Sequence, residues 1–142
     1  MKWTEKIPES EIKQKITDKT VDFAERFGLH LAKDDKSKYI DKKTGKEKEK
    51  IERKKLTTSQ LRKFFGEVKR QQIKGYNDTD FVLLLPKLAY AVGRVGDNDA
   101  KINDFNFVIS HAIKTVSNSD DFKRFIKIFE AIVAYHKSEE KE

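Results

Sequence analysis

The sequence predicts an all-α fold, namely a single-domain bundle of about five helices with a basic flexible linker between helix one and the rest. Three observations lead to this prediction. The 142 residues suit one hydrophobic core, apolar residues recur at helical spacing along most of the chain, and residues 33–55 contain few large apolar side chains. We therefore divide the single domain 1–142 into an N-terminal helix (1–32), a charged linker or loop (33–55) and a helical core (56–142).

The first helix is expected within residues 9–32, where apolar side chains recur at steps of three or four or their sums. Its buried stripe consists of Ile12, Ile16, Phe23, Phe27 and Leu31. The next stretch, 33–55, has 11 Lys and Arg against 6 Asp and Glu, so it carries +5 of the formal net charge of +7. Tyr39, Ile40 and Ile51 are too few to form a core, and Gly45 lies at the middle. This composition predicts a mobile, solvated linker.

A second helix is expected to begin after Thr57 and to end before Gly75. Thr57 and Gln60 have the spacing of a capping box, in which each side chain binds a free backbone amide of the other's residue. The apolar face of this helix consists of Leu61, Phe64, Phe65 and Val68. Glycine is a frequent helix stop because it adopts the left-handed conformation without strain.

The segment after Asn77 is apolar almost all round, which is typical of a central helix. Pro86 lies inside it and is expected to kink the axis, since proline removes one backbone hydrogen bond. The alternative is a buried strand over 81–85 with a helix that starts at Pro86.

Two further helices complete the predicted bundle. The first runs through Ile102, Phe105, Ile109 and Val116. Ser119 is expected to cap the last helix, and the charged tail from Ser138 is expected to fray. The buried stripe of the last helix consists of Phe122, Phe125, Ile126, Phe129, Ile132 and Val133.

The residues present predict a protein that is not an enzyme and that needs no cofactor or metal. The chain has no cysteine, and neither a phosphate-binding glycine loop nor a nucleophile elbow occurs in it. His30, His111 and His136 are far apart in sequence. His136 is expected on a fraying terminus, which is poorly suited to a rigid site. No apolar stretch resembles a secretory signal or a membrane span, so we expect no membrane association and a cytoplasmic location.

Cations gather on one side of the helix within 61–74. On a helical wheel, five cations lie opposite the apolar face with only Glu67 among them, whereas a solvated face usually mixes charges. These cations are Arg62, Lys63, Lys69, Arg70 and Lys74. Gly66 lies within the same face. It either lets a sugar–phosphate backbone approach closely or makes room for a neighbouring helix.

Lys87 and Arg94 fall on one stripe of the following helix, with Tyr90 beside them. If this stripe borders the basic face of the preceding helix, the two form a single groove. Arg94 has a second interpretation, in which it binds the terminal carbonyls of its own helix. Tyr90 either stacks on a base or belongs to the core, and core tyrosines are the more common case.

Three segments in series resemble the small subunit of type III-A CRISPR-Cas effector complexes, the Csm complexes. They are LTTSQLRKFFGEVKRQQ (56–72), LLLPKLAYAVGR (83–94) and FKRFIKIFEAIVAYHK (122–137), and the resemblance covers about 56–137. It implies a non-catalytic, all-helical protein that stacks in several copies along guide RNA and target RNA. Its other partners would be the backbone subunit and the large polymerase-like subunit. Carried over to this sequence, the basic contacts fall on Arg62, Lys69, Arg70, Lys87 and Arg94.

The leading hypothesis is thus a scaffold subunit in antiviral RNA-guided interference that binds RNA through backbone phosphates. The alternatives are a helical DNA-binding module and a protein–protein adaptor without direct nucleic-acid contact. We expect a monomer in dilute solution. A long flexible connection after helix one would also permit a helix-swapped homodimer.

Overall fold

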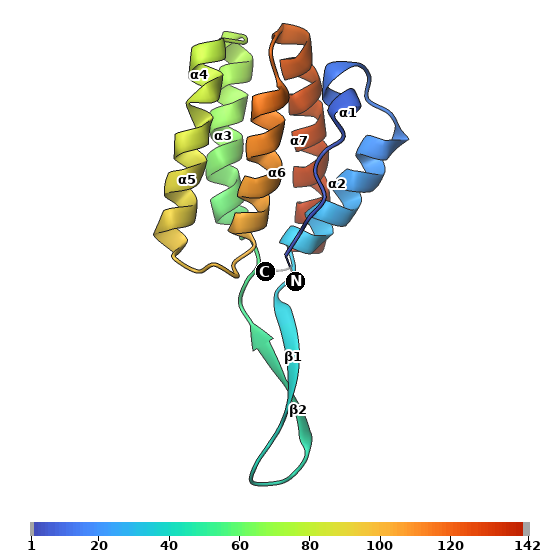
Figure 1. Cartoon of the computed structure of the whole chain (residues 1–142), viewed down its shortest axis with the longest axis vertical. Coiled ribbons are helices and arrows are strands. Elements are labelled where there is room, and N and C mark those ends of the chain that lie inside the picture. Colours follow the sequence, from blue (N-terminus) through green and yellow to red (C-terminus); the bar gives the residue numbers. More distant parts are fainter. Residues whose placement is uncertain (1, 141–142) are drawn as a thin grey trace.

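The computed structural model describes residues 2–140 and shows a helical bundle from one end of which a β-hairpin projects (Figure 1). The helices are α1 (Glu9–Lys13), α2 (Asp18–Leu31), α3 (Thr58–Lys74), α4 (Asp78–Val82), α5 (Leu84–Val95), α6 (Ile102–Thr115) and α7 (Ser119–Glu139). The strands β1 (Asp35–Ile40) and β2 (Glu47–Glu52) form the hairpin. The protein is therefore mainly helical, and the prediction of a strictly all-α fold is wrong. Within residues 2–140, no helix combines the length and apolar character needed to cross a bilayer.

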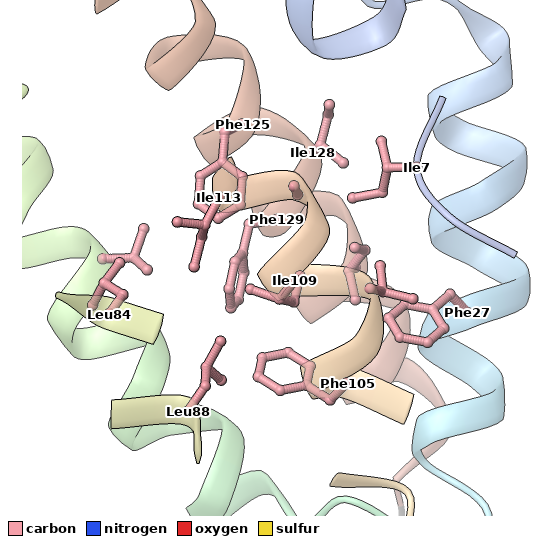
Figure 2. Packing of buried hydrophobic residues seen from close by; sticks show 14 of the residues in the cluster. Ile7, Phe27, Leu84, Leu88, Phe105, Ile109, Ile113, Phe125, Ile128 and Phe129 are labelled. Carbon is pink, nitrogen blue, oxygen red and sulfur yellow. The ribbon is translucent and has the colours of Figure 1, made fainter. Parts of the chain in front are cut away.

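The core lies around α6 and α7, which hold nearly half of its buried apolar side chains (Figure 2). α7 packs against α1, α2 and α3. α6 packs against α4 and α5 and also against α1 and α2, so it connects the N-terminal helices to α4 and α5. The ring of Phe129 on α7 lies 5.6 Å from that of Phe64 and 5.9 Å from those of Phe105 and Phe125, measured between centroids. Aromatic pairs at such distances stabilise the fold beyond the area they bury. α3, α6 and α7 are thereby fixed relative to one another.

The predicted N-terminal helix is two helices, with a break over residues 14–17. Thr17 caps α2, and the buried carboxylate of Glu11 accepts hydrogen bonds from the amides and hydroxyls of Thr17 and Thr20 at 2.7–3.1 Å. The first amides of a helix lack partners within the helix and attract negative charge. Glu11 supplies a hydrogen-bond acceptor and a negative charge at this end of α2. A separate helix therefore begins here, where the apolar spacing alone predicts one continuous helix.

The helix α3 confirms its prediction in detail. Thr57 Oγ1 accepts a bond from the Gln60 amide at 3.1 Å, and Gln60 Oε1 accepts one from the Thr57 amide at 2.9 Å. This is the expected capping box. Gly75 follows the helix with φ at 95°, in the region that glycine tolerates best.

Residues 81–85 are helical except for a break at Leu83, so the strand alternative is wrong. The predicted disruption by Pro86 is confirmed and takes the form of the break at Leu83, three residues earlier, because proline removes the hydrogen bond to the preceding turn and its ring clashes there. Pro86 thus lies in the first turn of α5, where an amide has no partner within the helix and its loss costs no further bond. Proline here marks the start of a helix.

The last helix begins at Ser119, but its cap is Asn118 and not the predicted Ser119. Asn118 Oδ1 accepts a bond from the Asp121 amide at 2.8 Å. The helix continues to Glu139, so the expected fraying is wrong for Ser138 and Glu139, while residues 141–142 of the expected tail lie outside the described residues. His136 is 0% exposed, with Nε2 2.5 Å from the Leu56 carbonyl, which fixes this end of α7 to the start of α3.

The predicted flexible linker, 33–55, forms the hairpin instead. The strands are antiparallel, and Asp35 lies opposite Glu52. At the turn Gly45 has φ at 69°, and the Asp41 amide donates to the Lys46 carbonyl at 2.9 Å. Asp41 also accepts a bond from the Lys43 amide at 2.8 Å, as in an Asx turn. Turn chemistry and cross-strand pairing form this element without an apolar face, so a scarcity of large apolar residues does not by itself predict a flexible linker.

Candidate nucleic-acid interface

A groove with a volume of about 420 Å³ runs between α3 and α5. Its lining includes the apolar side chains of Phe64, Leu88 and Phe105, and cations line it on both sides. Lys63 comes from α3, and Lys87 and Arg94 come from α5. An apolar lining with cationic edges suits a ligand that has flat apolar parts and negative charges.

Of the predicted basic face of α3, Lys63 lines this groove together with both cations of the α5 stripe, Lys87 and Arg94. Lys63, Lys87 and Arg94 are all exposed, so their charges are open to solvent. Within the described part of the chain, the Arg94 guanidinium has no hydrogen-bond partner. The interpretation of Arg94 as a cap of its own helix thus finds no contact among residues 2–140.

The other predicted cations lie on α3 outside this groove. Arg62 and Lys74 are exposed, and Arg70 pairs with Glu67 of its own helix. Lys69 is directed toward α7, where its Nζ lies 3.2 Å from Glu130 and 5.4 Å from the ring centroid of Phe65.

Glu67 is an acid among the residues that line the cationic groove. It accepts a bond from Lys87 Nζ at 2.9 Å and another from Arg70. The hydrogen bond from Lys87 lowers the pKa of Glu67, and Arg70 acts in the same direction against the opposing effect of burial. Glu67 is therefore ionised at neutral pH. An anionic ligand must compete with it for Lys87 and Arg70, whereas Lys63 and Arg94 face no such competitor among residues 2–140.

Tyr90 and Gly66 settle two questions that the sequence left open. Tyr90 is 68% exposed and lines the groove, so the prediction that it belongs to the core is wrong. Gly66 is exposed, and a Cβ added to it would meet nothing within 4 Å in the structure. The neighbouring-helix explanation of Gly66 is therefore wrong, and the surface beside it is open.

Several residues line the groove although the sequence did not lead us to predict them there. Ile102 and Phe105 of α6 contribute to its lining, although their spacing marked them only as core. Ser59 also lines it, and its position four residues before Lys63 was a usable signal because such residues share a helix face. The contribution of α6 depends on how the helices pack and left no signal in the local sequence.

The three histidines lie apart and serve the fold. His30 Nε2 lies 2.8 Å from Asp104, and its ring packs on Trp3 at 5.0 Å between centroids. His111 Nε2 lies 3.6 Å from Glu9. Among residues 2–140, no group of three or more His, Asp or Glu side chains is placed to hold a metal ion.

The groove and the elements around it lie in a segment that matches a known family. Comparison with curated proteins and with solved structures gave no match. The family model described as Csm2 Type III-A matches residues 32–142, which includes the hairpin that the three motifs left unaligned and excludes both α1 and α2. Because this match covers more than three quarters of the chain, the protein belongs to the Csm2 family, the small subunit of type III-A CRISPR-Cas Csm complexes.

Proposed function

We propose that the chain is an RNA-binding scaffold subunit of a type III-A ribonucleoprotein and that the α3–α5 groove holds a single RNA strand by its backbone phosphates. One observation carries the proposal: Lys63, Lys87 and Arg94 converge from two helices on one groove. Phosphate contacts of this kind position a protein without reading sequence. The activity is non-catalytic, in keeping with the character of the Csm2 family.

The rest of the groove suits the bases of the same strand. Tyr90 presents an exposed ring at its side, and Phe64 and Phe105 are partly or fully covered at its base. Stacking on aromatic rings contributes about 1–3 kcal/mol per base and tolerates every base. Arg62 and Lys74 extend the basic surface along α3, and Gly66 lies open for close backbone approach.

A salt titration tests the proposal. Each phosphate contact adds about −0.7 to the slope of log affinity against log salt for single strands, so four or five contacts predict about −3. The variant K63E/R94E should weaken binding of single-stranded RNA and flatten the slope. The control K123E/K127E makes the same charge change at exposed positions of α7. Equal losses in the two variants, or no loss in the first, would contradict an RNA groove between α3 and α5.

A competition experiment separates RNA binding from the DNA-binding alternative. Because the groove contacts phosphates and base faces, excess random duplex DNA should displace single-stranded RNA poorly. Selective binding of one duplex sequence would instead favour a helical DNA-binding module, since only base-edge contacts read sequence.

Membership of the family implies other Csm subunits as partners. We propose that several copies stack along guide RNA and target RNA in the cytoplasm as part of antiviral RNA-guided interference. The helix-swapped homodimer loses its main premise, because the connection after α2 is an ordered hairpin and not a flexible linker. Sedimentation of the isolated chain should show monomers at low concentration.

One observation favours protein contact as a second role. The side chains of Val82 and Leu83, at the junction of α4 and α5, are 49% and 50% exposed. Exposed apolar groups that lie together mark interaction surfaces. The variant V82S/L83S should lower the amount of Csm subunits retained in a nuclease-treated pull-down and leave RNA affinity unchanged. Retention at the unmodified level would argue against an adaptor surface here.

A further inference from the structure

We propose that the β1–β2 hairpin is a rigid cationic arm that binds the phosphate backbone of a nucleic-acid strand beyond the α3–α5 groove. The inference extends the proposed function, and it rests on three observations. The hairpin is fixed to the bundle at its base, it leaves both faces uncovered, and three lysines without an ion pair among residues 2–140 gather at its tip.

Lys101 anchors the base of the arm from the start of α6. Its side chain is 8% exposed, and Nζ donates to the carbonyls of His30 at 2.9 Å and Lys33 at 2.5 Å. Its backbone amide donates to the Lys54 carbonyl at 2.8 Å. One buried residue thus binds the chain both before β1 and after β2. Buried charged donors that are fully paired hold their partners firmly.

Asp34 joins the two ends of the hairpin directly. Its Oδ1 accepts bonds from the amides of Lys54 and Lys55 at 3.0 and 3.1 Å. Lys54 Nζ lies 2.7 Å from Asp97 in the turn before α6, and the Leu56 amide donates to the Leu31 carbonyl at 2.7 Å. The direction of the arm is therefore set by the bundle.

The arm projects away from the bundle and packs against none of its helices (Figure 1). Each strand has six residues, which at about 3.4 Å per residue gives a reach of roughly 20 Å. Tyr39, Ile40 and Ile51 are 48%, 70% and 60% exposed. A lone two-stranded hairpin is at best marginally stable, so an arm with such strong anchoring and uncovered faces is built to contact something outside this chain.

The distribution of charge indicates what it contacts. Along the strands, most lysines are balanced by acids: Lys38 lies 3.7 Å from Glu47, and Lys36 lies 3.7 Å from Glu49, while Lys50 of β2 is exposed without such a pair among residues 2–140. The tip instead carries a group of exposed lysines without an acid between them. This group consists of Lys42, Lys43 and Lys46.

Two acids flank the tip in sequence, and both are already occupied: Glu47 is the partner of Lys38, and the other acid is Asp41. Its Oδ2 lies 2.7 Å from Lys48, and its Oδ1 accepts the Lys43 amide. The tip lysines therefore present their charges outward. Lysine is depleted from the cores of protein interfaces but is a regular ligand of phosphates, which favours a nucleic-acid strand over a protein.

The arm also begins close to one end of the groove. Leu56 and Ser59, just after β2, line the groove together with Arg94 and Val95 at the end of α5. Figure 1 shows the hairpin leaving the bundle at this same end. A strand that lies along the groove toward this end is thus directed at the arm.

The test compares two lengths of single-stranded RNA, about 6 and about 20 nucleotides, which respectively fill the groove alone and extend past it. The variant K42Q/K43Q/K46Q should bind the short RNA as the unmodified chain does. It should lose affinity for the long RNA, and its salt slope should flatten by about 2, since three contacts contribute about 0.7 each. The control K123Q/K127Q/K137Q removes three exposed lysines from α7 and should change neither.

The outcomes separate the arm from the groove. Unchanged binding of the long RNA by the tip variant would contradict the proposal that the arm binds RNA. A loss of affinity that the α7 control reproduces would contradict it too. If K63E/R94E binds both RNAs normally while the tip variant loses affinity for the long one, RNA binding by the α3–α5 groove is contradicted and RNA binding by the arm is supported. Loss of a Csm partner without loss of RNA affinity would make the arm a protein contact and overturn the proposal.

Discussion

Lys87 Nζ on α5 lies 2.9 Å from Glu67 Oε2 on α3, and this ion pair crosses the groove that we propose for RNA. Glu67 also binds Arg70. The pair ties α3 to α5, and it neutralises cations that a phosphate would otherwise contact. Fold and binding thus compete for the same side chains.

Removing this acid should strengthen RNA binding. In E67Q, Lys87 and Arg70 lose their charged partner, so single-stranded RNA should bind more tightly. If the released Arg70 adds one phosphate contact to those that the groove already makes, the salt slope steepens by about 0.7. Fluorescence anisotropy at several salt concentrations measures both quantities. D22N makes the same charge change beside Arg26 on α2, away from the groove, and should leave binding nearly unchanged. Weaker binding by E67Q would show that Glu67 serves to hold the groove in shape.

Two helical glycines should respond to alanine in opposite ways. A Cβ on Gly28 would lie 2.8 Å from the Ile132 carbonyl oxygen and 2.9 Å from the His136 amide nitrogen of α7. G28A should therefore lower the free energy of unfolding by about 1–3 kcal/mol, as overpacking does. At Gly66 the space is open, and G66A should raise the free energy of unfolding by up to about 1 kcal/mol because alanine has the higher helix propensity. Urea titrations followed by circular dichroism compare the two, and equal effects would contradict the close α2–α7 contact.

The protein should lose stability in acid because of two buried carboxylates. Burial alone would raise the pKa of Glu11 and of Asp121, but hydrogen bonds outweigh it and lower both. For Glu11 the donors are Thr20 and Thr17, and for Asp121 the main donor is Lys13.

A carboxylate with a lowered folded-state pKa stabilises the fold fully above its unfolded pKa, here about 4.3 and 3.9. The stabilisation disappears as the pH falls through the folded pKa, because the unfolded chain binds more protons. Urea midpoints should therefore fall steeply below about pH 4.5. The variant E11Q/D121N should be less stable at pH 7 and show a flatter decline, whereas E25Q/D120N changes exposed acids and should keep the steep one. An equally steep decline in E11Q/D121N would assign the acid sensitivity to other groups.

Lys101 should control the order of the arm. In K101M the carbonyls of His30 and Lys33 lose their buried donor, which costs about 1–3 kcal/mol for unsatisfied groups. Amide hydrogen exchange within β1 and β2 should become faster than in the unmodified chain, while exchange in α6 and α7 changes less. K38M removes an exposed lysine of the hairpin and should leave the exchange rates nearly unchanged. Uniform acceleration throughout K101M would indicate loss of global stability instead.

The elements that followed from local rules were predicted well. α3 has its start at the Thr57–Gln60 capping box and its end at Gly75, because both signals act within a few residues. The buried stripes of α6 and α7 were likewise correct at Phe105 and Phe129. The break between α1 and α2 was missed because the Glu11 carboxylate caps a helix that begins several residues later.

The sequence by itself determined a mainly helical core, the family motifs over 56–137 and a surplus of cations from Arg62 to Arg94, since helical periodicity and composition are local properties. Only the tertiary structure decided which cations meet. Packing of α5 beside α3 placed Lys63 and Arg94 on one groove, whereas packing of α7 directed Lys69 to Glu130. The tertiary structure also orders residues 33–55 as an arm, although this stretch has no apolar pattern. The contacts that fix it come from Lys101 and Asp97, which are more than 40 residues away in the chain.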